Sequence, residues 1–173
     1  MKAAVVARLR NTLRVSAVLL ATAAAAIAAC HSPTAPPVEG VPDELEFSIG
    51  GFGAGMRFLR LHGDTVVTLQ VPWDYDPVVP IDSARLIPGP EAWRSFWGAV
   101  GTAGVHRWRS RYDQPDIVDG VGWSLTLRSA GFSVRSSGSN AFPDRLGRKH
   151  EGDYTGEFRL LLEALSELTG GEF

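Results

Sequence analysis

The chain has 173 residues, of which 45% are hydrophobic and 21% are charged, so neither a disordered chain nor a polytopic membrane protein fits its composition. It contains a single cysteine, which excludes a disulfide framework and a cysteine-based zinc cluster. The formal net charge is −2, but residues 1–29 hold 4 of the 17 basic residues and none of the 19 acidic ones. The rest therefore carries a net charge of −6, which argues against a nucleic-acid partner.

Residues 1–30 contain the three parts of a secretory signal peptide in their usual order. A basic start is followed by an apolar run from Val15 to Ile27, interrupted only by Ser16 and Thr22, and then by small residues. The run is shorter than the roughly 20 apolar residues that a membrane-spanning helix needs. We therefore expect residues 1–29 to act as a signal peptide rather than to span a membrane.

The stretch Ile27-Ala28-Ala29-Cys30 resembles the lipobox of bacterial lipoproteins, with an aliphatic residue three positions before the cysteine and small residues between them. The resemblance implies that the Cys30 thiol is alkylated with diacylglycerol and that cleavage makes Cys30 the N-terminus. It also implies a lipid bilayer as partner, since several acyl chains together anchor a protein stably. The alternative is an ordinary signal peptide or an uncleaved anchor, in which Cys30 is incidental.

His31 follows the cysteine, at the position where an aspartate marks enterobacterial lipoproteins for the inner membrane. The resemblance therefore implies the cell envelope, on the periplasmic face of an outer membrane where the organism has one. From His31 to Pro42 the chain holds four prolines in twelve residues, which is typical of an extended spacer. A tether of this kind would hold the folded part some 30 Å from the bilayer. The expected organisation is a signal peptide (1–29), a lipidated cysteine with its tether (30–42) and one domain (43–173).

The first half of the domain shows the period-two alternation of strands at 45–49, 56–61 and 65–71. A glycine-rich break separates the first two strands, and a tight hairpin joins the last two. The following loop, residues 72–90, contains a possible short pairing at 84–87. A helix is then expected to start at Pro90, because a missing amide donor does no harm at the first helical position, and to end at Gly101.

The second half begins with strict alternation over Val105–Tyr112, which predicts a strand. Two further strands at 123–128 and 132–136 form a hairpin. An apolar stripe over 158–168 predicts a final helix, with Thr155 or Asp153 as its N-terminal cap and glycines at its end.

These elements predict an α+β fold: a mostly antiparallel sheet of five to six strands with two helices packed on one face. The alternative is a small β-barrel or roll with the helices plugging one end. Tryptophan rings bury on the order of 200 Å² each, so those on the predicted helix and strands are expected to meet in one core. These are Trp93, Trp97, Trp108 and Trp123, whereas Trp73 in the loop is the ring expected to be exposed.

Three arginines of the predicted strand, Arg107, Arg109 and Arg111, are candidate anion-binding residues. On one strand face, neighbours would stand about 7 Å apart. A guanidinium group binds phosphate, sulfate or carboxylate through a planar fork, so an anionic glycan is a possible partner. The alternative is a solvated face whose arginines pair with acidic residues on neighbouring strands.

Other patterns for chemistry are weaker. The three aspartates of one loop can bind calcium through oxygen ligands, but the alternating spacing and closing glutamate of an EF-hand are missing. The four histidines show no metal-binding spacing, and the chain has no Gly-x-Ser-x-Gly elbow. We therefore expect no metal and no cofactor, and retain Ser137 and Asn140 of a polar cluster as candidate ligand-binding residues. The loop aspartates are Asp113, Asp116 and Asp119.

The second half resembles a group of small exported bacterial domains of uncharacterised activity. The similarity lies in Asp119-Gly120…Trp123, in the turn Gly138-Ser139-Asn140-Ala141-Phe142-Pro143, and in the closing helix; this chain departs from the pattern by an insertion at 144–153. The resemblance implies no activity. From the residues themselves, we expect the Asn140 side chain to hold the turn and Pro143 to end the strand.

The sequence therefore predicts an envelope lipoprotein whose domain binds or scaffolds a partner at the membrane surface without catalysis, the candidate partners being another envelope protein or an anionic glycan. Two alternatives stay open. One is an envelope hydrolase acting on glycans or esters through Ser137, Ser139, His106 or the aspartate loop. The other is a binder of an anionic ligand centred on the arginine face.

Overall fold

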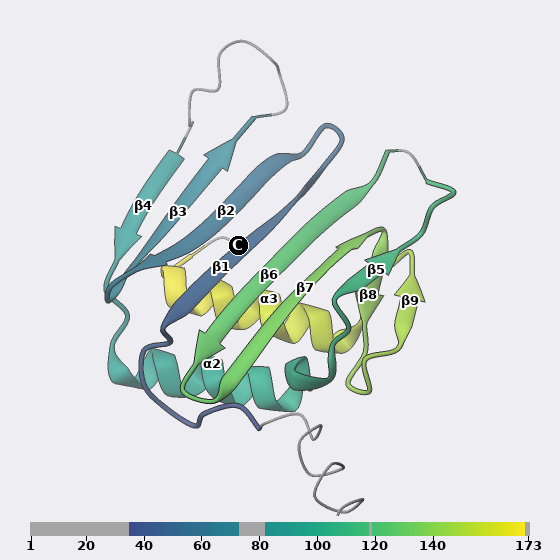
Figure 1. The fold of residues 1–173 in the computed structure, drawn as a ribbon. Coiled ribbons are helices and arrows are strands. Elements are labelled where there is room, and N and C mark those ends of the chain that lie inside the picture. Colours follow the sequence, from purple (N-terminus) through teal and green to yellow (C-terminus); the bar gives the residue numbers. More distant parts are fainter. Residues whose placement is uncertain (1–34, 73–81, 118, 172–173) are drawn as a thin grey trace, which may run out of the picture. The chain divides into compact units, whose positions relative to one another are not determined.

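A seven-stranded sheet with two helices on one side makes up the fold of the described residues, which in this computed structural model are 35–72, 82–117 and 119–171. Its strands are β1 (Glu44–Gly51), β2 (Gly55–His62), β3 (Thr65–Val71), β4 (Asp82–Leu86), β5 (Arg111–Asp113), β6 (Val121–Ser129) and β7 (Phe132–Ser139). In space they lie in the order β4-β3-β2-β1-β6-β7-β5 (Figure 1). Neighbouring strands are antiparallel except β5 and β7, which run parallel.

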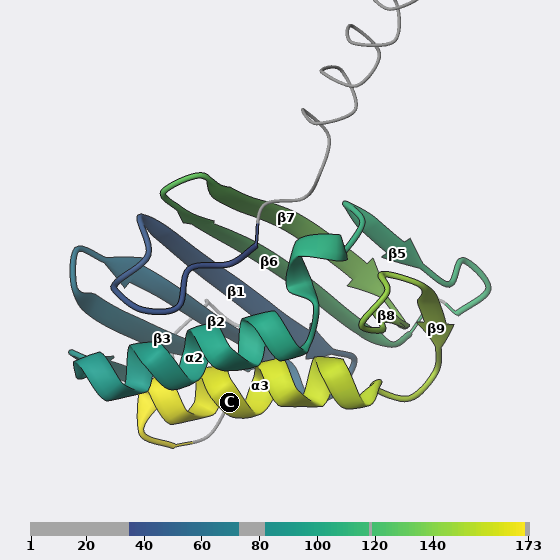
Figure 2. The same cartoon turned by 90° about the horizontal axis from the view of Figure 1, so that it is seen from below.

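The helices α2 (Pro90–Thr102) and α3 (Gly156–Thr169) lie side by side on the same face of the sheet (Figure 2). A short 3-10 helix, η1 (Val105–Arg107), follows α2, and a separate hairpin of β8 (Ala141–Pro143) and β9 (Lys149–Glu151) precedes α3. The predicted α+β fold, with two helices on one face of a mostly antiparallel sheet, is confirmed. The sheet has seven strands rather than five or six, because short strands extend both of its edges.

Alternation along the central strands separates the core from the opposite side of the sheet, called here the open face. In β1, the buried residues Leu45, Phe47 and Ile49 point toward the helices, whereas Glu46 and Ser48 point to the open face. β2 pairs with β1 in a register that puts Leu59 opposite Phe47. No described element covers the open face (Figure 2).

Both helices form where the sequence predicts them. α2 begins at Pro90 and buries the expected stripe of Trp93, Phe96, Trp97 and Val100. Its predicted end at Gly101 is wrong by a few residues, because the helix continues to Thr102 and the left-handed turn (φ 68°) falls at Gly104.

The last helix also matches its predicted boundaries. α3 is capped by Thr155, whose hydroxyl accepts a hydrogen bond from the Phe158 amide at 3.2 Å. It ends at Gly170, which takes a left-handed conformation with φ 67°. Phe158 opens a buried stripe on this helix that faces the sheet.

The strand predicted over Val105–Tyr112 is wrong. The chain forms η1 there, and only Arg111–Asp113 at its end is a strand. The residues that are buried are Val105, Trp108 and Tyr112, whose spacing of three and four does not suit one strand face. Packing of these three side chains into the core outweighed the alternating pattern.

The core is built from aromatic rings that meet between the sheet and the helices. Trp123 of β6 lies at its centre, with ring centroids 4.9 Å from Phe158, 5.9 Å from Trp108 and 6.0 Å from Tyr112. Its indole N–H donates to the Ala141 carbonyl at 2.9 Å, so the one polar group of this buried ring has a hydrogen-bond partner. The prediction of a shared core is confirmed for four tryptophans, and Trp73 lies outside the described residues.

The segment before β1 lies against α2. The Trp97 indole N–H donates to the Gly40 carbonyl at 2.8 Å, and Pro42 is buried. Further back, the Pro36 ring lies 3.6 Å from the position that a side chain on Gly101 would occupy. Residues 36–42 of the predicted tether are therefore docked on the folded part rather than free.

We expect Trp123→Ala to lower the free energy of unfolding by about 3–5 kcal/mol, because it leaves a large cavity among three other rings and frees the Ala141 carbonyl. Urea denaturation followed by far-UV circular dichroism measures the loss. Ile87→Ala is the control: this residue is 65% exposed, so its loss should be within about 0.5 kcal/mol. A near-neutral Trp123→Ala would contradict the assigned core.

Candidate functional site: the open face and its hollow

The open face carries an apolar half and a hydroxyl-rich half. Phe58 of β2 and Val67 and Leu69 of β3 point to this side, where Phe58 and Leu69 are register partners. The neighbouring strands β1, β6 and β7 present only polar or small residues here. Their hydroxyl side chains are Ser48, Ser124, Thr126, Ser133, Ser137 and Ser139.

A hollow of about 460 Å³ lies where these two halves meet. Its apolar lining includes Phe58, which is 38% exposed, together with Val67 and Leu69. Its polar lining includes the Ser48 and Ser124 hydroxyls, which are hydrogen-bonded to each other at 2.8 Å. Such a hollow suits an apolar group that also carries a polar substituent.

Three ionisable side chains also line the hollow, and the histidine among them is not close enough to a serine hydroxyl to take up its proton. Glu46 and Arg60 make an exposed ion pair at 2.7 Å. His62 also lines the hollow, but it is four residues along β2 from Phe58, or about 13 Å at the rise of a strand. Since Phe58 is the register partner of Ser48, the histidine is too far from that hydroxyl to act as its base.

The structure separates the three candidate arginines. Arg107 belongs to η1 and Arg109 follows it; both are exposed, and neither makes an ion pair with any described residue. Arg111 lies on β5, where its guanidinium pairs with Asp113. The expected ladder on one strand face is therefore wrong, because the segment is not one strand.

Ser137 lies on the open face of β7, as the register partner of Arg111. Its hydroxyl donates to the Ser110 carbonyl at 3.4 Å. Asn140 takes part in a turn instead: it is 8% exposed, has φ 51°, and its Oδ1 accepts from the Val121 amide at 2.7 Å. This confirms that the Asn140 side chain holds the turn, and it places Asn140 away from any open surface.

The residues proposed for hydrolysis do not converge. The pKa of His106 is lowered, first by burial and then by the neighbouring Arg107 charge. No hydrogen bond within the described ranges joins His106 to Ser137 or Ser139. The described part of the aspartate loop forms no cluster that could hold a metal ion.

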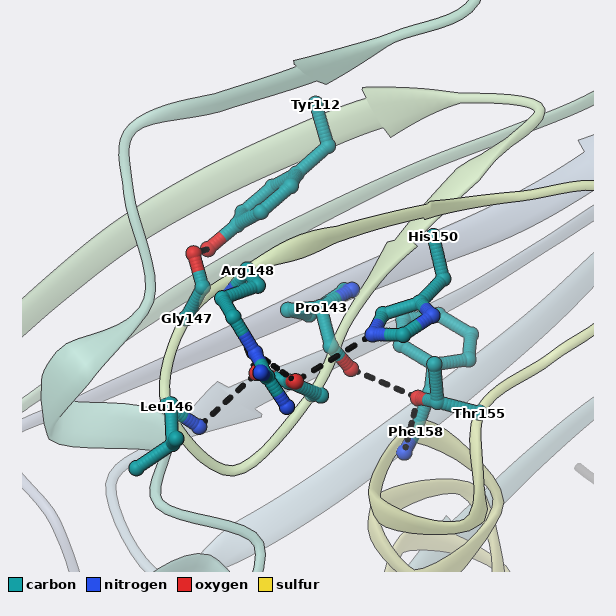
Figure 3. Close-up of polar contacts among 9 residues, drawn as sticks. Tyr112, Pro143, Leu146, Gly147, Arg148, His150, Thr155 and Phe158 are labelled. Atoms are coloured by element: carbon teal, nitrogen blue, oxygen red, sulfur yellow. Dashed lines mark hydrogen bonds and ion pairs between the residues drawn. The ribbon is translucent and has the colours of Figure 1, made fainter.

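Sequence reasoning missed a polar centre at Asp144, in the turn between β8 and β9. Its carboxylate is 7% exposed and accepts hydrogen bonds from the Leu146 amide (2.8 Å) and the Arg148 amide (2.9 Å). It also binds the Arg148 guanidinium at 2.6 Å and the His150 ring at 3.2 Å. Figure 3 shows Leu146, Arg148 and His150 arranged around this turn.

The surroundings of Asp144 set its charge. Burial by itself raises the pKa of the carboxyl, but the hydrogen bonds from Arg148, His150 and Leu146 outweigh it and hold the pKa far below its ordinary value of 3.8. The carboxylate is thus ionised at neutral pH with its oxygens occupied by four donors. These hydrogen bonds stabilise the β8–β9 turn.

No family model, no curated protein and no solved structure matches this chain. Within the described residues, no helix is long and apolar enough to cross a bilayer. A function must therefore be inferred from the chain's own residues.

We expect Asp144→Asn to lower the free energy of unfolding by about 1–3 kcal/mol at neutral pH, because the amide nitrogen cannot accept from Arg148 or His150. The folded-state pKa lies below 3.8, so the carboxylate contributes fully above that value and loses its contribution as the pH falls below it. The difference between wild type and variant should therefore shrink in acid.

Urea denaturation at neutral pH and at about pH 3 tests this. Glu91→Gln is the matched control, because Glu91 forms an ion pair but its side chain is 91% exposed. Its effect should be within about 0.5 kcal/mol at either pH. An Asp144→Asn effect that grew on acidification would contradict the assigned hydrogen bonds.

Proposed function

We propose that this chain is an envelope lipoprotein, anchored through a diacylglycerol thioether on Cys30, whose domain binds another envelope component without catalysis. The observation that carries the anchor is the position of the chain's single cysteine, at the end of a basic, apolar and small-residue leader. Cys30 and His31 lie outside the described residues, so their support comes from the sequence alone. The periplasmic face of an outer membrane is the proposed location.

The open face supports the binding role. A hollow with Phe58, Val67 and Leu69 on one side and paired serine hydroxyls on the other offers apolar area with defined polar contacts. We propose that it receives an apolar side chain of a partner protein in the envelope. The hydrolase alternative has less support, because the candidate serines and His106 share no hydrogen bond among the described residues.

The alternative of an anionic ligand is now supported by two of the three candidate arginines. Arg111 is neutralised by Asp113, which removes one member of the original set. Arg107 and Arg109 keep unpaired, exposed guanidinium groups in the described structure. An anionic ligand would therefore bind beside η1 rather than along a strand.

We expect Cys30→Ser to abolish incorporation of an alkyne-bearing fatty acid and to move the protein from the membrane pellet to the soluble fraction. The reason is that serine lacks the thiol to which the diacylglycerol is attached. Labelling in living cells followed by fractionation measures both effects, with His31→Ser as the neighbouring control. Mass spectrometry of wild-type protein showing a free thiol at Cys30 would contradict the proposal.

We expect the hollow to bind the neutral dye Nile red, and the double variant Phe58→Ser/Leu69→Ser to weaken that binding about tenfold. A neutral dye is needed because an anionic one would also be attracted to exposed arginines. Fluorescence titration measures the affinity, and Ile117→Ser is the control, because this exposed apolar residue lies in the loop after β5, at the opposite edge of the sheet from β3. Equal binding by wild type and the double variant would show that this face is not a binding site.

A further inference from the structure

Three exposed arginines and one exposed leucine lie together where η1 meets the β8–β9 turn. This basic corner consists of Arg107, Arg109, Arg145 and Leu146. We infer that it contacts the anionic phosphate headgroups of the membrane in which Cys30 is anchored. The inference rests on the proposed lipid anchor, and it adds which end of the domain faces the membrane.

Backbone contacts hold the members of the corner in place. A Cβ on Gly104 would stand 2.4 Å from the Arg145 carbonyl oxygen, and one on Gly147 would stand 2.2 Å from the Arg107 carbonyl oxygen. The Tyr112 hydroxyl accepts from the Arg109 amide at 2.7 Å and donates to the Gly147 carbonyl at 3.1 Å. The two glycines thus let η1 and the β8–β9 turn approach closely, and Figure 3 shows Tyr112 meeting Gly147.

The charges around the corner leave it positive. Each acid of the adjoining strands and turn already has a cation: Asp144 binds Arg148, Asp113 binds Arg111, and Glu151 binds Lys149. None of the arginines of the basic corner makes an ion pair with a described residue. Asp116 and Asp119 belong to the loop that follows β5, at the end of this strand that lies away from η1 (Figure 1). The corner therefore keeps a net charge of about three, which complements an anionic surface.

Leu146 adds an apolar contact in the middle of this charge. It is 58% exposed at the tip of the turn, directly after Arg145. A large apolar side chain beside arginines is the composition that binds at a lipid interface, where the leucine enters the headgroup region and the guanidinium groups bind phosphate. A free phosphate ion would gain no contact from the exposed leucine, whereas a lipid interface would.

The docked segment brings the anchor to this corner. Gly40 lies beside Trp97 and Pro36 lies beside Gly101, so the chain runs toward the C-terminal end of α2 as it is followed back toward Cys30. The next turn, at Gly104, contacts Arg145 directly. Glu39, the acid of this segment, precedes Gly40 and so belongs to the end nearer Trp97.

Chain length then limits how far the corner can be from the membrane. Four residues lie between Cys30 and Ala35, the first described residue, and the five Cα–Cα steps that join them span at most about 18 Å when fully extended. This is shorter than the spacer of about 30 Å that a free 30–42 tether would give. A lipid on Cys30 therefore keeps the α2–η1 end of the domain next to the headgroups, where arginines are attracted to anionic lipid.

The test uses the full lipidated protein reconstituted into vesicles. A diacylglycerol thioether consumes the only native thiol, so Leu146→Cys provides one site for a polarity-sensitive dye, and Ile87→Cys provides a matched site at the other end of α2. In phosphatidylcholine vesicles containing phosphatidylglycerol, we expect the dye at 146 to shift to shorter wavelength and to be quenched by headgroup-region spin-labelled lipid. The dye at 87 should show neither effect.

Charge reversal identifies the cause. Adding Arg107→Glu and Arg109→Glu should weaken the contact by at least about 25-fold together, because losing each positive charge costs roughly fivefold and each glutamate also adds a repelled negative charge. Arg85→Glu, an exposed arginine on β4 without an ion pair among described residues, should leave the contact unchanged. High salt should weaken the contact in the same way, because it screens the attraction.

The outcomes separate this inference from the proposed anchor. If protein without an added cysteine takes up the thiol dye, Cys30 is not lipidated and both proposals fail. If Cys30 carries lipid but the dye at 146 behaves like the dye at 87, or shifts equally in pure phosphatidylcholine, the headgroup contact is wrong and the anchor stands. Near-UV circular dichroism of each variant checks that the fold is retained.

Discussion

The burial of Phe158 and Trp123 against each other is the interaction on which the rest of this structure depends. Phe158 begins the inward stripe of α3, and Trp123 lies at the middle of the sheet, so their contact fixes the helix on its face. The Trp123 indole also binds the Ala141 carbonyl, which locates the β8–β9 hairpin. Because all these groups point inward, none of the described elements lies on the opposite face of the sheet.

The residues that could bind something divide into two groups with different chemistry. The hollow on the open face combines apolar side chains with hydroxyls that already bond to each other, so it favours shape and apolar area over charge. The basic corner lies at the end of α2 and combines one leucine with guanidinium groups that form no ion pair within the described ranges. The two surfaces can be occupied at once, since one faces away from the helices and the other lies at the end of α2.

Much of the fold was predictable because the periodicity of apolar residues along the sequence matches the faces that the helices and strands bury. The inward stripe of α2, the Thr155 cap of α3 and the hairpin of β6 and β7 all follow from residue periodicity. The segment after α2 was not predictable, since its alternating arginines suit a strand, whereas Val105 and Trp108 are drawn into the core by tertiary contacts. Asp144 was missed for a related reason: its partners Arg148 and His150 are polar residues that surround it only after the turn has formed.

The contact between Gly40 and Trp97 has a mechanical consequence. A protein held by its N-terminal end feels any drag on the domain as tension in the segment that leads to β1. Because this segment lies along α2, the load passes first into the indole and the helix rather than peeling β1 away from β2 and β6. In a chain anchored at Cys30, as proposed above, the central strand β1 would thereby be shielded from the force that acts on the anchor.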